Sequence, residues 1–108
     1  MKFFSFVETP EFTKKIVKLL TDEEFAAFQI FLCENPDFGK LIKGSGGIRK
    51  VRWMSGGKGK SGGIRVLYYL INDDGKILFL DVYPKNERET ITDDEIKQLR
   101  SVVEGFRQ

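Results

Sequence analysis

The spacing of apolar residues at the start of the chain changes from a strand pattern to a helical one. Within residues 2–8 successive side chains alternate between two faces, one of them rich in Phe, which predicts a strand. Thr9 and Pro10 then supply a helix N-cap and the residue favoured at the first helical position. Apolar residues follow at helical spacing as far as Leu20, so we expect a helix over residues 10–20.

A second helix is expected almost immediately afterwards. Thr21 and Glu24 have the spacing of a capping box, in which each side chain bonds the backbone N–H of the other residue. The helix should end at Asn35, because the residue before a proline avoids the helical conformation. Its expected buried face consists of Phe25, Phe28, Phe31 and Leu32. The short connection predicts an αα-hairpin.

The second half of the chain has three strand patterns and one more helix. Runs rich in β-branched and aromatic residues at 47–54, 64–71 and 77–84 predict strands. A capping box formed by Thr92 and Glu95 opens a C-terminal helix that reaches about Phe106. The expected order is β-α-α-β-β-β-α. This order is typical of an α+β fold with a mainly antiparallel sheet, and residues 1–108 are expected to form one domain.

The turn between the last two predicted strands decides which side chains share a face. A three-residue turn with Gly75 in the left-handed position pairs Arg65 with Tyr83, and Lys85 then lies one pleat further along the same side. A two-residue turn would instead place Asp81 on the apolar face. The first pairing is preferred, because it predicts an uninterrupted apolar face. That face would contain Ile64, Val66, Tyr68, Leu70, Leu78, Leu80 and Val82.

Charge is distributed unevenly, although the net charge is only +2. Residues 40–65 carry eight Lys and Arg side chains and no Asp or Glu, whereas residues 1–39 and 66–108 are each net acidic. A solvated surface normally mixes both signs, so this one-sign stretch indicates a polyanionic partner, and we expect it to bind the phosphates of RNA. A basic loop kept for solubility is the alternative interpretation.

Other features of the composition narrow the chemistry. Cys33 is the only cysteine, which excludes an intramolecular disulfide, fits a reducing compartment and predicts packing within a helix. The chain has no histidine, so the commonest acid–base group and the commonest metal ligand are missing. No segment resembles a signal peptide or a membrane span. We therefore expect a cytoplasmic protein that uses no metal or small-molecule cofactor and does not associate with a membrane.

A glycine-rich loop at residues 55–63 carries Lys58 and Lys60. Residues 57–62 match the G-x-G-x-x-G fingerprint of dinucleotide binding, but that fingerprint requires a helix after the glycines, and a strand pattern follows here. Glycines allow the backbone to approach a phosphate closely, and the two lysines supply charge. A flexible hairpin tip is the alternative. Trp53, which precedes the loop, is expected in the core rather than in a base-stacking role.

Four stretches of the sequence combine into a longer pattern. They are Asn35-Pro36, Gly44-x-Gly46-Gly47-Ile48-Arg49-Lys50-x-Arg52, Gly57-Lys58-Gly59-Lys60-x-Gly62-Gly63-x-Arg65-x-x-Tyr68-Tyr69, and Tyr83-x-Lys85-Asn86-Glu87. Together with the capped C-terminal helix, this pattern resembles the RelE superfamily over nearly the whole chain. Its nearest branch is the HigB-type toxins of bacterial type II toxin–antitoxin systems. The resemblance implies a RelE-like fold.

The resemblance also implies an activity. Such a toxin is a ribosome-dependent mRNA endoribonuclease, or mRNA interferase, which inhibits translation by cutting mRNA in the ribosomal A site and is neutralised by a cognate antitoxin. It works without metal: the ribose 2′-hydroxyl attacks the adjacent phosphorus and leaves 2′,3′-cyclic phosphate and 5′-hydroxyl ends. The catalytic roles of the family fall on Lys60, Arg65, Tyr83 and Lys85 of this chain.

Each of these side chains suits one part of that reaction. Arg65 matches the geometry and charge of a phosphorane. Tyr83 would orient the nucleophile or stack on a base, and Lys60 and Lys85 are candidates for base and acid in either order. The remaining cations of the basic segment are predicted to bind RNA of the message or the ribosome: Arg49, Lys50, Arg52 and Lys58.

Two other functions remain open on the sequence alone. The first is a non-catalytic RNA- or ribosome-binding module of the same fold, in which the cations only hold phosphates. The second is a structural partner protein whose basic face docks an acidic chain.

Overall fold

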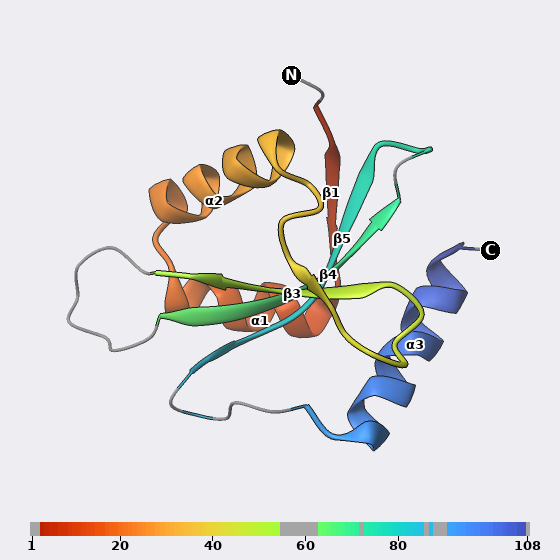
Figure 1. Cartoon of the computed structure of the whole chain (residues 1–108). Helices are drawn as coiled ribbons and strands as arrows, with labels where there is room; N and C mark the ends of the chain where they lie inside the picture. The colour runs from red at the N-terminus through yellow and green to blue at the C-terminus, as the bar shows by residue number, and fades with distance from the viewer. Residues whose placement is uncertain (1–2, 55–62, 72, 86, 88–90, 108) are drawn as a thin grey trace.

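The fold is built on a five-stranded sheet, as a computed structural model of the chain shows (Figure 1). The structure describes residues 3–54, 63–71, 73–85, 87 and 91–107. Within them the strands are β1 (Ser5–Glu8), β2 (Lys40–Leu41), β3 (Ile48–Trp53), β4 (Ile64–Ile71) and β5 (Lys76–Pro84). They lie in the order β1-β5-β4-β3-β2, where β1 is parallel to β5 and the other pairs are antiparallel. The expected α+β class with a mainly antiparallel sheet is confirmed.

Three helices accompany the sheet, and each begins at the cap that the sequence predicts. They are α1 (Pro10–Leu19), α2 (Asp22–Glu34) and α3 (Asp93–Arg107). The hydroxyl of Thr9 accepts a hydrogen bond from the Phe12 N–H at 3.1 Å. Both reciprocal bonds of the capping box at the start of α2 are present. Thr92 and its Glu partner make the same pair of bonds at the start of α3.

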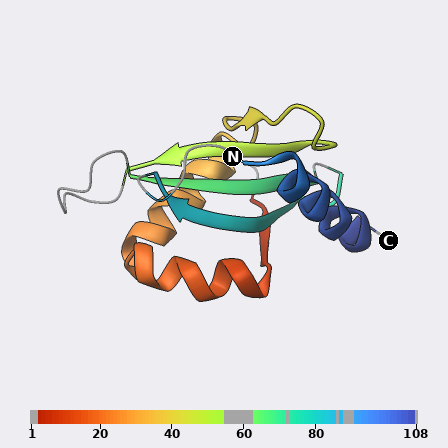
Figure 2. The ribbon, with the colours of Figure 1, turned by 90° about the horizontal axis from the view of Figure 1, so that it is seen from below.

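The two faces of the sheet carry separate cores (Figure 2). On one face α1 and α2 cover a cluster that includes Phe12, Phe28 and Phe79, and the rings of Phe12 and Phe79 stack at 4.7 Å. On the other face α3 contributes Val103 to a cluster with Leu67. No helix within the described part of the chain has both the length and the apolar composition needed to cross a membrane.

The register between β4 and β5 is only half as predicted. Arg65 lies opposite Tyr83, as expected, and Gly75 has the expected positive φ of 65°. The predicted three-residue turn is wrong, however, because Ile71 pairs with Lys76 rather than with Ile77. A β-bulge then shifts the pairing, so that Tyr68 lies opposite Phe79 instead of Leu80. Leu80 and Leu78 consequently belong to the cluster under α3, and the single uninterrupted apolar face that included them is wrong. The sequence could not reveal the bulge, because both faces of β5 are apolar and both are covered.

One boundary and one additional strand also differ from the expectation. The first strand begins at Ser5 rather than at residue 2. The short strand β2 was not predicted, because two residues carry no periodic pattern; it pairs Lys40 with Lys50 and Leu41 with Arg49. This pairing brings the chain that follows α2 to the edge of β3, where part of the basic segment lies.

Candidate nucleic-acid interface

Three of the candidate site residues lie in one row across the sheet. Arg52 in β3 is directly opposite Arg65 in β4, which is directly opposite Tyr83 in β5. Side chains at paired positions project from the same face, with Cβ atoms about 5 Å apart. The backbone N–H of Lys85 donates to the Gly63 carbonyl at 3.1 Å, so the pairing continues one step beyond β5. Lys85, two residues after Tyr83, therefore lies on the same side of the sheet, as predicted.

The members of this row differ in how far they are buried. Arg52 is exposed, whereas Arg65 is 7% exposed and Tyr83 only 1% exposed. The Arg65 guanidinium reaches the carbonyl of Ile64 at 3.4 Å. Tyr83 is packed in the cluster under α3 with Leu80, so its ring has no open face for a base. This burial argues against base stacking by Tyr83, and its role in orienting the nucleophile stays a prediction.

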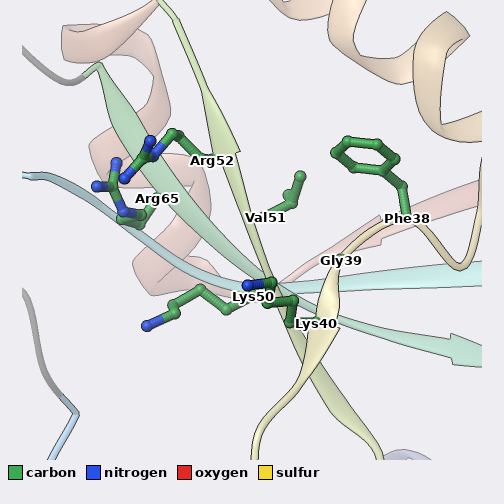
Figure 3. A pocket seen from close by; sticks show the side chains of 7 residues that line it. All are labelled: Phe38, Gly39, Lys40, Lys50, Val51, Arg52 and Arg65. Carbon is green, nitrogen blue, oxygen red and sulfur yellow. The ribbon is translucent and has the colours of Figure 1, made fainter.

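Two members of this row, Arg52 and Arg65, line an open depression of about 700 Å³ at the edge of β3. Figure 3 shows the guanidinium groups of Arg52 and Arg65 on one side of Val51 and the ring of Phe38 on the other. The Lys50 side chain extends toward the side of Arg65. The residues that line the depression are Phe38, Gly39, Lys40, Lys50, Val51, Arg52 and Arg65.

Like charges face each other twice at this depression. Arg52 is opposite Arg65, and Lys40 is opposite Lys50 in the pairing of β2 with β3. Such cross-strand pairs are destabilising on their own. The ion pairs among the described residues are made by Lys14 and Lys15 of α1, and none reaches Arg52, Lys40 or Lys50. A bound polyanion would relieve this repulsion, which makes the depression well suited to a phosphate backbone.

Arg49 is separated from the other cations of β3. Because side chains alternate along a strand, Arg49 projects from the opposite face to Lys50 and Arg52. Its guanidinium donates to the carbonyls of Asp37 and Gly39 at 3.0 and 2.7 Å. These bonds give Arg49 a part in holding the segment after α2, and its predicted contact with RNA stays a prediction.

Lys58 and Lys60 lie outside the described residues, so the structure leaves their predicted roles as predictions. Gly63 is the first described residue after them, and its backbone conformation is constrained. Gly63 has a φ of 61°, and a Cβ added there would collide with the backbone carbonyl of Trp53. Only a residue without a side chain fits this close approach of β3 and β4.

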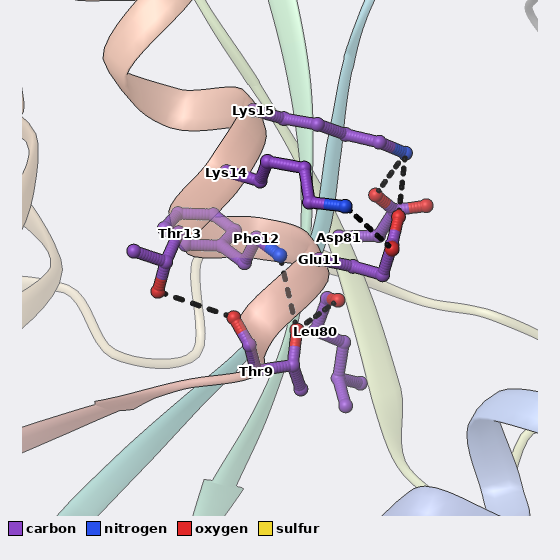
Figure 4. Close-up of polar contacts among 8 residues, drawn as sticks. All are labelled: Thr9, Glu11, Phe12, Thr13, Lys14, Lys15, Leu80 and Asp81. Atoms are coloured by element: carbon purple, nitrogen blue, oxygen red, sulfur yellow. Dashed lines mark hydrogen bonds and ion pairs between the residues drawn. The ribbon is translucent and has the colours of Figure 1, made fainter.

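The bulge that sets the position of Tyr83 is tied to α1 (Figure 4). Asp81 follows the unpaired bulge residue Leu80, and its carboxylate accepts a hydrogen bond from the Val82 N–H at 2.9 Å. The same oxygen lies 2.8 Å from the ammonium of Lys15. The hydroxyl of Thr9 donates to the Leu80 carbonyl at 2.8 Å. Helix α1 thus contacts the strand two residues from the candidate site.

Tyr68 is the most unusual polar residue near the depression, and sequence analysis assigned it only to an apolar face. It is fully buried, and its hydroxyl donates to the Pro36 carbonyl and accepts from the Gly39 N–H, both at 2.9 Å. Burial raises the pKa of Tyr68 above its ordinary value of 10.0, although the Gly39 hydrogen bond and the Arg49 charge act in the opposite direction. No sequence signal marks this contact, which joins segments far apart in the chain.

The remaining candidates have structural surroundings. Cys33 is buried in α2, as predicted. Trp53 packs against the rings of Phe28 and Phe31, at 5.1 and 5.3 Å, so the prediction of a core role is confirmed. Among the described residues no group of three or more His, Cys, Asp or Glu side chains is arranged to hold a metal ion. Phe38 and Lys40 line the depression but had not been identified as site residues.

Known structures share this architecture. A mutant of the toxin RelE of E. coli in the free state superposes with a TM-score of 0.62, at 16% sequence identity over 94% of this chain and 96% of that chain. The isolated E. coli RelE toxin gives a TM-score of 0.58, at 14% identity over 92% and 98%. RelE in the intact E. coli RelBE toxin–antitoxin complex gives 0.56, at 18% identity over 73% and 93%. These similarities establish a RelE-like fold.

The family assignment rests on the sequence. The family model described as the RelE toxin of the RelE/RelB toxin–antitoxin system matches residues 39–108, which is well over half of the chain. The matched region contains the whole depression except Phe38, together with Tyr83 and Lys85. The chain therefore belongs to the RelE toxin family.

Proposed function

We propose that this protein is a ribosome-dependent mRNA endoribonuclease that inhibits translation by cutting messages in the A site. The observation that carries the proposal is the position of Arg65, which lies between Arg52 and Tyr83 in one cross-strand row. Together with Arg52, it lines a basic depression. Membership of the RelE toxin family supports the same reading. RNA that enters the depression meets cations from β2, β3 and β4.

The reaction needs charge on the phosphorane oxygens, a base for the 2′-hydroxyl and an acid for the leaving 5′-oxygen. Arg65 supplies the charge, because its guanidinium is permanently protonated and is held nearly buried by the surrounding sheet. Tyr83 is next to it and orients the reacting group. Lys60 and Lys85 act as base and acid, in either order.

The proposed chemistry requires no metal. The 2′-oxygen forms a bond to phosphorus while the bond from phosphorus to the 5′-oxygen breaks, and the proton removed from the 2′-hydroxyl is balanced by the one given to the 5′-oxygen. The products are a 2′,3′-cyclic phosphate and a 5′-hydroxyl. Four cations contact the RNA backbone outside the cleaved bond: Arg49, Lys50, Arg52 and Lys58. Lys40 belongs to the same set, because it lies opposite Lys50.

The proposal extends to a protein partner. The RelBE complex of E. coli pairs a toxin of this fold with its antitoxin. We infer that a cognate antitoxin neutralises this chain in the cytoplasm, and that the chain belongs to the HigB-type branch on the basis of its sequence pattern. A small antitoxin gene adjacent to the toxin gene, whose coexpression restores growth, is the expected genetic arrangement.

The test is inducible expression of the wild type and of Arg65→Ala, with growth and mRNA 5′ ends recorded. Wild type should arrest growth and produce cuts in phase with codons, ending in 5′-hydroxyl groups. Arg65→Ala should abolish both, and the matched control Arg107→Ala, on the exposed end of α3, should behave as wild type. The circular-dichroism spectrum and Tm of each variant check its fold.

The same experiment separates the proposal from a non-catalytic binding module. In a module that only holds phosphates, single Lys or Arg changes weaken RNA binding by small and similar steps, and no residue is indispensable. Undiminished codon-phased cleavage by folded Arg65→Ala, or growth arrest without any new 5′ ends, would contradict the proposed chemistry.

A further inference from the structure

We propose that Phe38 is a stacking platform for one base of the bound RNA, held in position by Tyr68 and Arg49. The inference rests on the proposed function only in taking single-stranded RNA as the ligand of the depression. Phe38 lines the same depression as Arg52 and Arg65, on the far side of Val51 (Figure 3). A base-stacking aromatic beside a cationic groove is the general arrangement by which proteins bind single strands.

The ring of Phe38 is presented to solvent rather than packed in the core. It is 60% exposed and makes an edge contact with Phe31, with ring centroids 5.0 Å apart and an angle of 84° between the planes. Phe31 in turn contacts the half-buried Trp53. A chain of aromatic contacts therefore leads from the core to Phe38 and leaves most of its ring free for a planar partner.

An isolated exposed phenylalanine would be unremarkable, but the backbone on both sides of this one is fixed. The hydroxyl of Tyr68 bonds the Pro36 carbonyl and the Gly39 N–H, and Arg49 bonds the carbonyls of Asp37 and Gly39. Four hydrogen bonds from two strands thus hold Pro36, Asp37 and Gly39 around Phe38. Such support fixes where the ring is presented, and a binding residue gains affinity when it is preorganised.

Gly39 shows how closely the segment is fitted to the sheet. A Cβ added at Gly39 would lie 2.9 Å from the Tyr68 ring and hydroxyl and 3.1 Å from the Cβ of Arg49. The absence of a side chain lets the backbone approach Tyr68 closely enough for the hydrogen bond. From this anchor the chain continues directly into Lys40, which lies opposite Lys50. Phe38, which would stack on the base, and Lys40, which would contact a phosphate, therefore belong to the same anchored segment.

The test measures RNA binding rather than cleavage. Short single-stranded 2′-O-methyl RNAs, which lack the free hydroxyl that the proposed reaction requires, are titrated at low salt, where phosphate contacts keep weak complexes measurable. One set is intact, and the others carry a single abasic site at successive positions. The proteins are wild type, Phe38→Leu and Phe38→Trp, with Phe3→Leu as control, because Phe3 is also exposed but lines a separate depression beside α2.

One abasic position should weaken binding to wild type by roughly tenfold. Phe38→Leu should bind the intact RNA about that much more weakly and should no longer distinguish it from the abasic RNA, because the two changes remove the same contact. Phe38→Trp and Phe3→Leu should retain the discrimination. Tyr68→Phe, which keeps the ring but loses both hydrogen bonds, should reduce the discrimination while it leaves the salt dependence of binding unchanged.

Several results would overturn the inference. These are equal affinity of wild type for all the RNAs, no binding at all, or unchanged discrimination by Phe38→Leu. If Phe38→Leu keeps its RNA affinity but binds the cognate antitoxin more weakly, Phe38 belongs to a protein interface instead. Base-dependent binding through Phe38 without any mRNA cleavage would support the platform and contradict the proposed enzyme, so the two proposals fail separately.

Discussion

The ammonium of Lys15 lies 2.8 Å from a carboxylate oxygen of Asp81, and this contact connects α1 to the bulge of β5. The Asp81 side chain is 15% exposed, so the ion pair is largely shielded from water on the side of the strand. The bulge shifts the pairing of β5 by one residue between the turn and the site. The ion pair therefore stabilises the part of the strand that sets which face Tyr83 occupies.

Replacing Asp81 by Ala is expected to destabilise the fold by about 1 to 2 kcal/mol, because both the Lys15 ammonium and the Val82 N–H lose their acceptor. Urea unfolding followed by circular dichroism measures the change. The control is Glu11→Gln, whose ion pairs are 3.9 Å long and exposed, and whose effect should be about 0.5 kcal/mol or less. Equal effects of the two changes would show that the Asp81 contact contributes nothing specific.

Tyr68→Phe is expected to cost about 1 to 3 kcal/mol at neutral pH, because the Pro36 carbonyl and the Gly39 N–H lose their buried partner. The raised pKa adds a pH dependence. Above the unfolded-state pKa of about 10 the unfolded chain releases the tyrosine proton while the folded chain retains it. The stability contributed by protonated Tyr68 is thus fully present below that pKa and is lost as the pH rises through the folded-state pKa.

The measurement is the difference in unfolding free energy between wild type and Tyr68→Phe, at neutral pH and at several alkaline values. Other groups titrate in both proteins and cancel in the difference. The stability advantage of wild type should shrink as the pH rises above about 10. A difference that stays constant or grows across this range would be inconsistent with a buried, protonated Tyr68.

Gly63→Ala is expected to destabilise the fold by more than 1 kcal/mol. The new Cβ would meet the Trp53 carbonyl, and the φ of 61° is unfavourable for any residue with a side chain. Gly105→Ala is the control, since nothing lies within 4 Å of an added Cβ on α3 and alanine favours a helix, so it should be neutral or stabilising. Thermal unfolding of the two variants beside wild type distinguishes these outcomes.

Arg52→Gln should make the free protein slightly more stable, by a few tenths of a kcal/mol, because it removes the like charge opposite Arg65. It should also weaken RNA binding. The Tm of each protein is measured with and without added sulfate, a small anion that guanidinium groups bind. Sulfate should stabilise wild type more than the variant. A lower Tm of the variant without sulfate would mean that Arg52 stabilises the free fold.

The elements that sequence predicts well are those encoded by neighbouring residues. The caps at Thr9, Thr21 and Thr92 involve side chains within three residues of each helix start, and all three are present. The opposition of Arg65 and Tyr83 was predicted from a three-residue turn, but the strands pair Ile71 with Lys76 at the turn. The bulge at Leu80 shifts the register by one residue and so produces the predicted pairing of Arg65 with Tyr83.

What sequence could not predict depends on contacts between distant segments. The bulge follows Phe79, whose ring stacks on Phe12, so this part of β5 is fitted to a helix far away in the sequence. The wall formed by Phe38 depends on Tyr68, thirty residues further along the chain. The sequence of a strand does not show whether a tyrosine hydroxyl will bond a distant loop or face solvent.

The parallel pairing of β1 with β5 affects how the chain folds as it is synthesised. Residues 5–8 find their partners only at residues 76–79, so the first strand stays unpaired until β5 has been made. Until then Phe12 also lacks Phe79, the β5 residue on which its ring stacks. Long-range pairing of this kind slows folding. The wall that contains Phe38 and Lys40 therefore acquires its supporting core on the α1 side only after β5 has been made.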